Sequence, residues 1–188
     1  MPRTDFDKDL RLLQDELLQL GGMVEKAIER AVDALKRRDL RAAEEVVEDD
    51  DIIDQKRFDL EERCIDLIAT QQPLAGDLRI LITTLHMSVE LERIGDYAEG
   101  IAKICILMGN EPPLKPLIDI PRMAEKANDM LRRSLDAFVN RDVIAANVVC
   151  SDDDEVDALY DQVYRELLTY MMADPGAIRR ATYLLWVA

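Results

Sequence analysis

The sequence is poor in aromatic residues and in positive charge, and each of these shortages makes some classes of protein improbable. Aromatic residues make up 5% of the 188 positions and hydrophobic residues 48%, a composition typical of helices that pack through Leu, Ile, Val and Ala. Lys and Arg number 24 against 39 Asp and Glu, so the net charge is −15. This charge repels nucleic acid and anionic lipid and favours cations or a basic protein surface as partners.

Long apolar runs are also absent. None approaches the roughly 20 residues that a membrane span requires, and the N-terminal stretch MPRTDFDKDLRLLQDELLQL lacks the apolar core of a signal peptide. Cys64, Cys105 and Cys150 form no Cys-x-x-Cys pair and fall on apolar helical positions, so we interpret them as core residues. We predict a cytoplasmic protein without direct membrane insertion.

Apolar residues recur at steps of three and four along most of the chain, which is the pattern of α-helices with one buried stripe. In the first half the pattern predicts helices from near Phe6, from Asp39 to about Ala69, and from the turn at Pro73 to about Met108. Gly21 and Gly22 interrupt the first of these and favour a kink or a close helix contact over a break.

A proline-rich segment divides the chain. Residues 110–121 contain four prolines, which no helix interior tolerates, and helical periodicity resumes at about Arg122. We therefore predict a first bundle in residues 1–109, a linker in residues 110–121 and a second bundle in residues 122–188.

The two halves are related by an internal repeat. Val32–Asp54 aligns without a gap with Leu135–Asp157 at a shift of 103 residues, and the GDLR at 76–79 matches the GAIR at 176–179 at a shift of 100. Each repeat contains three helices. The predicted fold is therefore all-α, with two tandem three-helix bundles that arose by duplication.

The second bundle is predicted to be incomplete. At the shift of 100, the counterparts of Glu92 and Asp96 fall beyond Ala188, so the chain ends within its last helix. Such a bundle exposes apolar surface on the remaining helices, which favours association of two copies as a homodimer.

Carboxylates gather beside the apolar stripes of the second and third helices. Asp50 and Asp54 precede Pro73 by 23 and 19 residues, and Glu92 and Asp96 follow it by 19 and 23. If the two helices are antiparallel, all four carboxylates meet at one level of the bundle. An oxygen-only cluster suits hard cations such as Mg²⁺, Ca²⁺ or Mn²⁺, and carboxylate-rich bundles also hold iron.

Other interpretations stay open. The repeat copies Asp153 and Asp157 imply a second metal site that lacks its other half, and the whole acidic row can instead be a solvated face paired locally with Lys or Arg. A carboxylate-bridged di-iron oxidase is the alternative from the enzyme class, but such enzymes need Glu-x-x-His ligand pairs, and the lone histidine, His86, follows Thr83 at that spacing. A structural helical protein with an acidic face is the third possibility.

Four segments point to a known family: LGGMVEKAIERAV, QQPLAGDLRILITTL, ELERIGDYAEGIAK and LLTYMMADPGAIRRATYLLWVA. Together they resemble the PhoU family of phosphate-signalling proteins along essentially the whole chain. The resemblance implies two three-helix bundles and Glu/Asp-x-x-x-Asp motifs that bind metal clusters (Fe, Mg, Mn or Zn). On this chain the motifs fall on Asp50 with Asp54, Glu92 with Asp96, and Asp153 with Asp157.

The resemblance also implies a function. Proteins of this family are negative regulators of phosphate transport and phosphate homeostasis, without enzyme activity. Their partners are the ATPase subunit of the phosphate-specific (Pst) ABC transporter and the PhoR-type sensor histidine kinase. The resemblance therefore implies a cytoplasmic protein that associates peripherally with inner-membrane complexes through its partners.

Overall fold

Two hairpins of long helices, each continued by one further helix, make up the computed structural model, which describes the backbone of residues 3–188 and the side chains of residues 6–188. The first bundle consists of α1 (Arg3–Arg37), α2 (Leu40–Gln71) and α3 (Ala75–Met108). The second consists of α4 (Asp119–Asn140), α5 (Val143–Ala173), the short 3₁₀ turn η1 (Pro175–Ala177) and α6 (Ile178–Val187). No strand occurs in residues 3–188, so the all-α prediction is confirmed.

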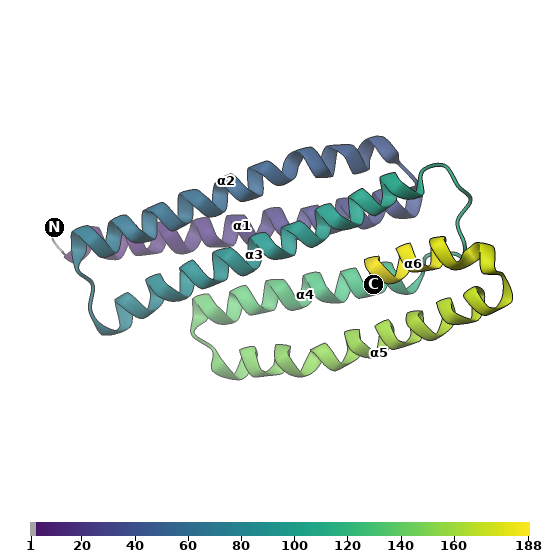
Figure 1. The fold of residues 1–188 in the computed structure, drawn as a ribbon. Coiled ribbons are helices and arrows are strands. Elements are labelled where there is room, and N and C mark those ends of the chain that lie inside the picture. Colours follow the sequence, from purple (N-terminus) through teal and green to yellow (C-terminus); the bar gives the residue numbers. More distant parts are fainter. Residues whose placement is uncertain (1–2) are drawn as a thin grey trace.

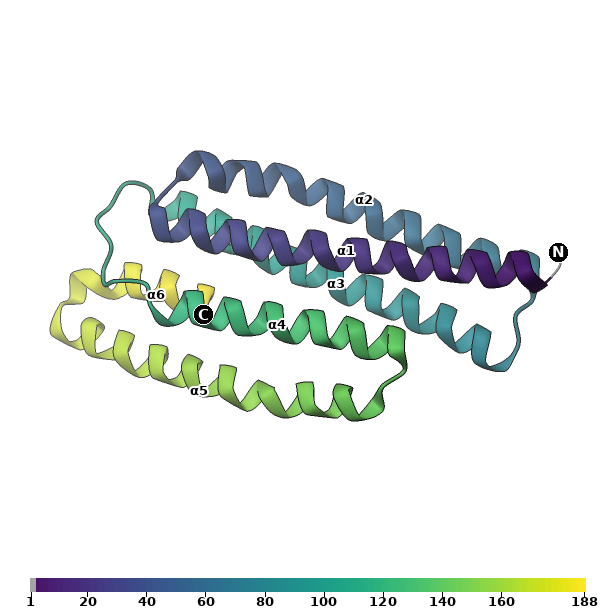
Figure 2. The same cartoon turned by 180° about the vertical axis from the view of Figure 1, so that it is seen from behind.

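The bundles lie side by side with their long axes in similar directions (Figure 1). Seen from behind, α4 runs along α1, and α6 lies at the end of the molecule where α3 finishes (Figure 2). The α1–α4 and α3–α6 contacts join the two bundles into one apolar core. None of the helices in residues 3–188 combines the length and apolar composition needed to cross a membrane.

The core of the first bundle follows the apolar repeat read from the sequence. The most deeply buried large side chains of α1 are fully enclosed in this core: Leu13, Leu17, Leu20, Val24 and Leu35. Each buried leucine of this kind contributes about 1.5–3 kcal/mol of hydrophobic stabilisation. Cys64 and Cys105 are also buried, as predicted, whereas Cys150 is exposed because α5 turns that position to solvent.

The internal repeat is visible in backbone detail. Asp39 caps the start of α2 by accepting a hydrogen bond from the Ala42 amide at 3.0 Å, and Asp142 caps α5 by accepting one from Ala145 at 2.9 Å. The residue before each cap is an arginine in the left-handed region: Arg38 at φ 60° and Arg141 at φ 55°. Two αα-turns of the same geometry confirm that the aligned segments fold alike.

Gly21 makes the close helix contact that the sequence favoured at this position. A Cβ atom there would overlap Cδ1 of Leu135 on α4, whereas a Cβ on Gly22 would meet nothing within 4 Å. The missing side chain of Gly21 therefore lets the two bundles approach each other through α1 and α4.

The linker ends earlier than predicted. Residues 119–121 belong to α4, which begins at Asp119, because proline needs no hydrogen-bond acceptor for its nitrogen in the first turn of a helix. Within the linker, Lys115 is 7% exposed and forms an ion pair with Glu166 of α5, which holds the segment against the second bundle.

The second bundle carries an apolar groove. Helix α6 spans ten residues, whereas α3 spans 34. A groove of about 430 Å³ lies between α3, α4 and α5, lined by apolar side chains with His86, Glu90 and Asp153 among them.

Candidate metal centre

The candidate site lies where α2 and α3 run antiparallel, on the helix faces that follow the buried stripe. Ile53 of α2 packs against Gly95 of α3: a Cβ added to Gly95 would lie 3.2 Å from Ile53 Cγ2 and 3.5 Å from Asp50 Oδ1. The first distance is tighter than most Cβ contacts, and the second is an ordinary van der Waals contact. Glycine at this position therefore lets the two helices bring their acidic rows together.

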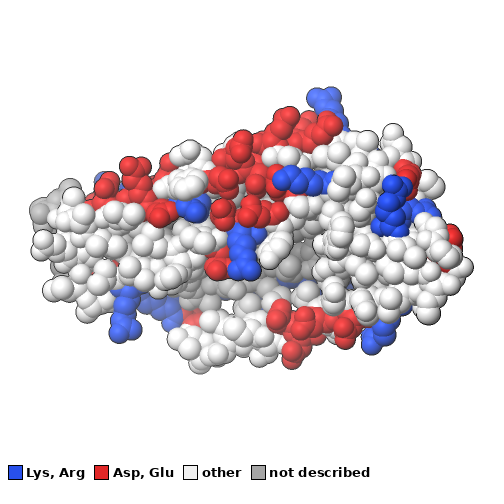
Figure 3. All heavy atoms as spheres, in the orientation of Figure 1, with Lys and Arg blue, Asp and Glu red and all other residues white. Residues whose placement is uncertain are grey.

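Three carboxylates converge at this point. Asp50 and Asp54 of α2 and Asp96 of α3 each offer an oxygen atom, and these atoms lie within 4.8 Å of one another. Oxygen ligands on opposite sides of a cation at about 2.4 Å are separated by at most about 4.8 Å, so this spacing fits a single hard cation. The face in Figure 3 shows acidic side chains gathered over α2 and the neighbouring part of α3.

The carboxylates raise one another's pKa. The pKa of Asp50 is raised from 3.8 to about 6, first by burial and then by the negative charges of Glu99, Asp54 and Asp96, while Lys103 partly opposes the rise. The pKa of Glu92 is also raised, by burial and then by Asp96 and Asp54, against the lowering effect of Arg57. Without a cation, the folded protein therefore holds these negative charges under mutual repulsion.

Two arginines on the same helices as the cluster pair with other acids. Arg57 donates to Glu61 at 2.6 Å and Arg93 lies 3.5 Å from Glu90. Among the side chains of residues 6–188, no salt bridge includes Asp50, Asp54, Glu92 or Asp96. The Oδ1 atom of Asp54 is buried and accepts no hydrogen bond. A buried carboxylate oxygen without a donor is destabilising unless a cation neutralises it, so the donor set fits a hard metal ion.

The predicted residues are brought together only in part. Asp50, Asp54 and Asp96 form the cluster. Glu92 lies close enough for the charges of Asp96 and Asp54 to raise its pKa. Asp153 and Asp157 on α5 are exposed and join no comparable group in residues 6–188. Asp153 instead lines the apolar groove, as does His86.

Glu99 is an acid beside the cluster that the sequence-based prediction left out. It acts on Asp50 more strongly than any other acid and forms a 2.5 Å ion pair with Lys103. The available signal was its place in the acidic row of α3, one turn after Asp96. Glu99 is therefore a charged neighbour of the cluster and lies outside the group of three carboxylates whose oxygens approach one another.

The fold and the site define a class: all-helical proteins of two repeated bundles, with a carboxylate cluster suited to a hard cation between two antiparallel helices. The family model described as PhoU domain matches residues 17–105 and 120–188. The chain therefore belongs to the PhoU family, as the sequence motifs indicated.

Individual relatives agree with this assignment. The chain is 42% identical to the phosphate-specific transport system accessory protein PhoU homolog of Aquifex aeolicus, over 96% of this chain and 82% of that protein. The protein of the same name from Clostridium acetobutylicum is 40% identical, over 100% and 86%. The crystal structure of PhoU from Pseudomonas aeruginosa matches with a TM-score of 0.90 at 36% identity, over 97% and 88% of the two chains.

Proposed function

We propose that this chain is a metal-binding adaptor that restrains phosphate uptake and phosphate-starvation signalling. Its relatives carry names of accessory proteins of a phosphate-specific transport system, which supports a regulatory role in phosphate transport. The proposed partners are the ATPase subunit of the Pst transporter and a PhoR-type sensor kinase. The protein would act in the cytoplasm and reach the inner membrane through them.

One observation carries the metal-binding part of this proposal. Asp54 has a buried oxygen without a donor, and one of its carboxylate oxygens lies within 4.8 Å of oxygens of Asp50 and Asp96. A divalent or iron cation there would neutralise the three carboxylates and tie α2 to α3. Mg²⁺, Mn²⁺, Fe and Zn²⁺ are the candidates.

Metal content tests the site directly. Asp54→Asn removes the charge and leaves the shape nearly unchanged, and Asp51→Asn is the matched control because Asp51 is exposed three residues earlier on α2. We expect metal in stoichiometric amount in the wild type and in Asp51→Asn by elemental analysis, and a loss in Asp54→Asn. The double variant Glu92→Gln/Asp96→Asn should lose it too. Unchanged stoichiometry in both site variants would refute the site.

The adaptor role is tested by co-elution with the transporter's ATPase on size exclusion, before and after chelation. Binding that chelation weakens would support an adaptor in which the metal participates. Absence of binding in both states would argue against the transporter as partner and turn attention to the kinase.

Regulation is proposed without catalysis. His86 is exposed and lines the apolar groove rather than the carboxylate cluster. The cluster therefore lacks the imidazole ligand that bundle-type di-iron oxidases use.

A further inference from the structure

Four exposed apolar side chains continue the line of the carboxylate cluster along α2 and α3. They are Phe58 and Ile65 of α2, each 53% exposed, and Ile82 and Val89 of α3, 41% and 43% exposed. We call these four residues the apolar ledge. Single exposed apolar residues are ordinary, but a row of four on adjoining helices is a surface patch that needs an explanation.

The antiparallel register places the four side chains in two opposed pairs. Ile53 of α2 meets Gly95 of α3. Phe58 lies five residues after Ile53 and Val89 six residues before Gly95, so these two residues lie at about the same level of the antiparallel pair. Seven more residues on each helix bring Ile65 to the level of Ile82. On each helix the seven-residue step is nearly two turns, so both pairs lie on the same side of the α2–α3 hairpin.

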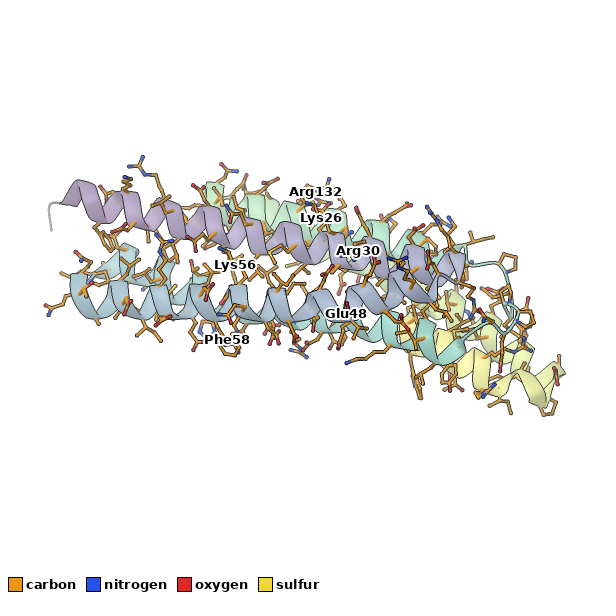
Figure 4. The ribbon with its side chains drawn as sticks, turned by 90° about the horizontal axis from the view of Figure 1, so that it is seen from above. Lys26, Arg30, Glu48, Lys56, Phe58 and Arg132 are labelled. Atoms are coloured by element: carbon orange, nitrogen blue, oxygen red, sulfur yellow. The ribbon has the colours of Figure 1, made fainter. Side chains whose placement is uncertain are left out.

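Phe58 lies on the outer surface of the hairpin. In Figure 4, Lys56 of α2 lies towards α1, where it pairs with Glu16, whereas Phe58 lies at the opposite edge of α2. The Arg57 guanidinium carbon lies 4.2 Å from the centre of the Phe58 ring and supports it from the protein side. The ring is therefore held in place while its outer face is open to a partner.

Acidic groups border the ledge. The carboxylate cluster lies at one end, and Glu62 and Asp66 are exposed beside it on α2. Helix α2 as a whole carries eleven acidic and four basic residues. In Figure 3 the surface towards the α2–α3 turn is largely free of charged groups, next to the acidic area over α2.

We propose that the apolar ledge binds a basic amphipathic helix of a partner protein. This inference rests on the adaptor function proposed above and adds the chemistry of the segment that the partner would present. From Ile65 to Asp54 is eleven residues, about 17 Å at 1.5 Å per residue, which matches about three helical turns. The partner's apolar stripe covers the four side chains, and its Lys or Arg residues reach the bordering acids. A second copy that pairs through the same surface does not fit, because its own acidic α2 would meet these acids with like charge.

Peptide titration tests the ledge independently of any transporter. The probes are two helical peptides of about 15 residues with Leu at helical spacing, one with Lys and one with Glu at the remaining positions. Two protein variants change the ledge: Phe58→Gln/Val89→Gln and Ile65→Gln/Ile82→Gln. The matched control, Ile52→Gln/Leu107→Gln, changes two apolar residues that are 57% and 62% exposed elsewhere on the same helices.

By fluorescence anisotropy we expect the Lys peptide to bind saturably, with affinity roughly tenfold weaker in each ledge variant and nearly unchanged in the control. Equal affinity in ledge and control variants, tighter binding of the Glu peptide, or no saturable binding would overturn the proposal. So would a concentration-dependent dimer that the ledge variants abolish, since it would assign the ledge to a second copy. If the wild type fails to co-elute with the ATPase, the transporter proposal fails while the peptide result still decides the ledge.

Discussion

Replacing Asp50 by asparagine should stabilise the metal-free protein at neutral pH. The folded-state pKa of Asp50 is about 6 against an ordinary 3.8, so its charge destabilises the folded state above pH 6 by at most about 3 kcal/mol. Because Asp50 is only partly buried, water screens part of this repulsion, and we expect about half, ~1.5 kcal/mol. For a chain of this size that is a rise in Tm of about 3–6 °C.

The sign of the pH dependence follows from the raised pKa. Below about pH 4 the Asp50 carboxyl is protonated in both the folded and the unfolded chain and contributes nothing. As the pH rises from about 4 to about 6, the unfolded chain releases this proton first, so the destabilisation builds up in that window. The advantage of Asp50→Asn should therefore be full at pH 7.5 and vanish near pH 4.

The assay is thermal unfolding by circular dichroism in EDTA, with Asp51→Asn as the control because that residue is exposed on the same helix. Adding Mn²⁺ should reverse the order, since a cation that binds only the folded wild type stabilises it by mass action. A lower Tm for Asp50→Asn in EDTA at pH 7.5, or the same shift at pH 4 as at pH 7.5, would show that Asp50 is not held under charge repulsion.

Two glycine pairs give further tests. Gly22→Ala should stabilise the protein by up to about 1 kcal/mol, because alanine favours the helix. Gly21→Ala should lower the free energy of unfolding by about 1 kcal/mol, because its methyl group meets Leu135. Equal effects of the two variants in urea unfolding would contradict the α1–α4 contact. Gly95→Ala should reduce metal content without altering a ligand, because its methyl group presses on Ile53, which lies between Asp50 and Asp54 on α2. Gly100→Ala, which meets nothing within 4 Å, should keep its metal.

Part of the site could be predicted by counting residues from one turn. Asp54 and Glu92 lie at equal distances from Pro73 along the chain. A short connection nearly fixes the register of two antiparallel helices, so equal distances are enough to bring these residues to one level. The buried, unpartnered oxygen of Asp54 could not be predicted in this way. It depends on side-chain rotamers and on Arg57 turning to Glu61 instead.

The sequence by itself determined the helices, their duplication and the hairpin that opposes the acidic rows of α2 and α3. These follow from periodicity and turn residues, which act over a few positions along the chain. Only the tertiary structure decided that Gly21 meets Leu135, that Glu99 acts on Asp50, and that Asp153 lines an apolar groove. Such contacts depend on how whole helices pack, and because packing joins residues far apart in the chain, no local pattern encodes them.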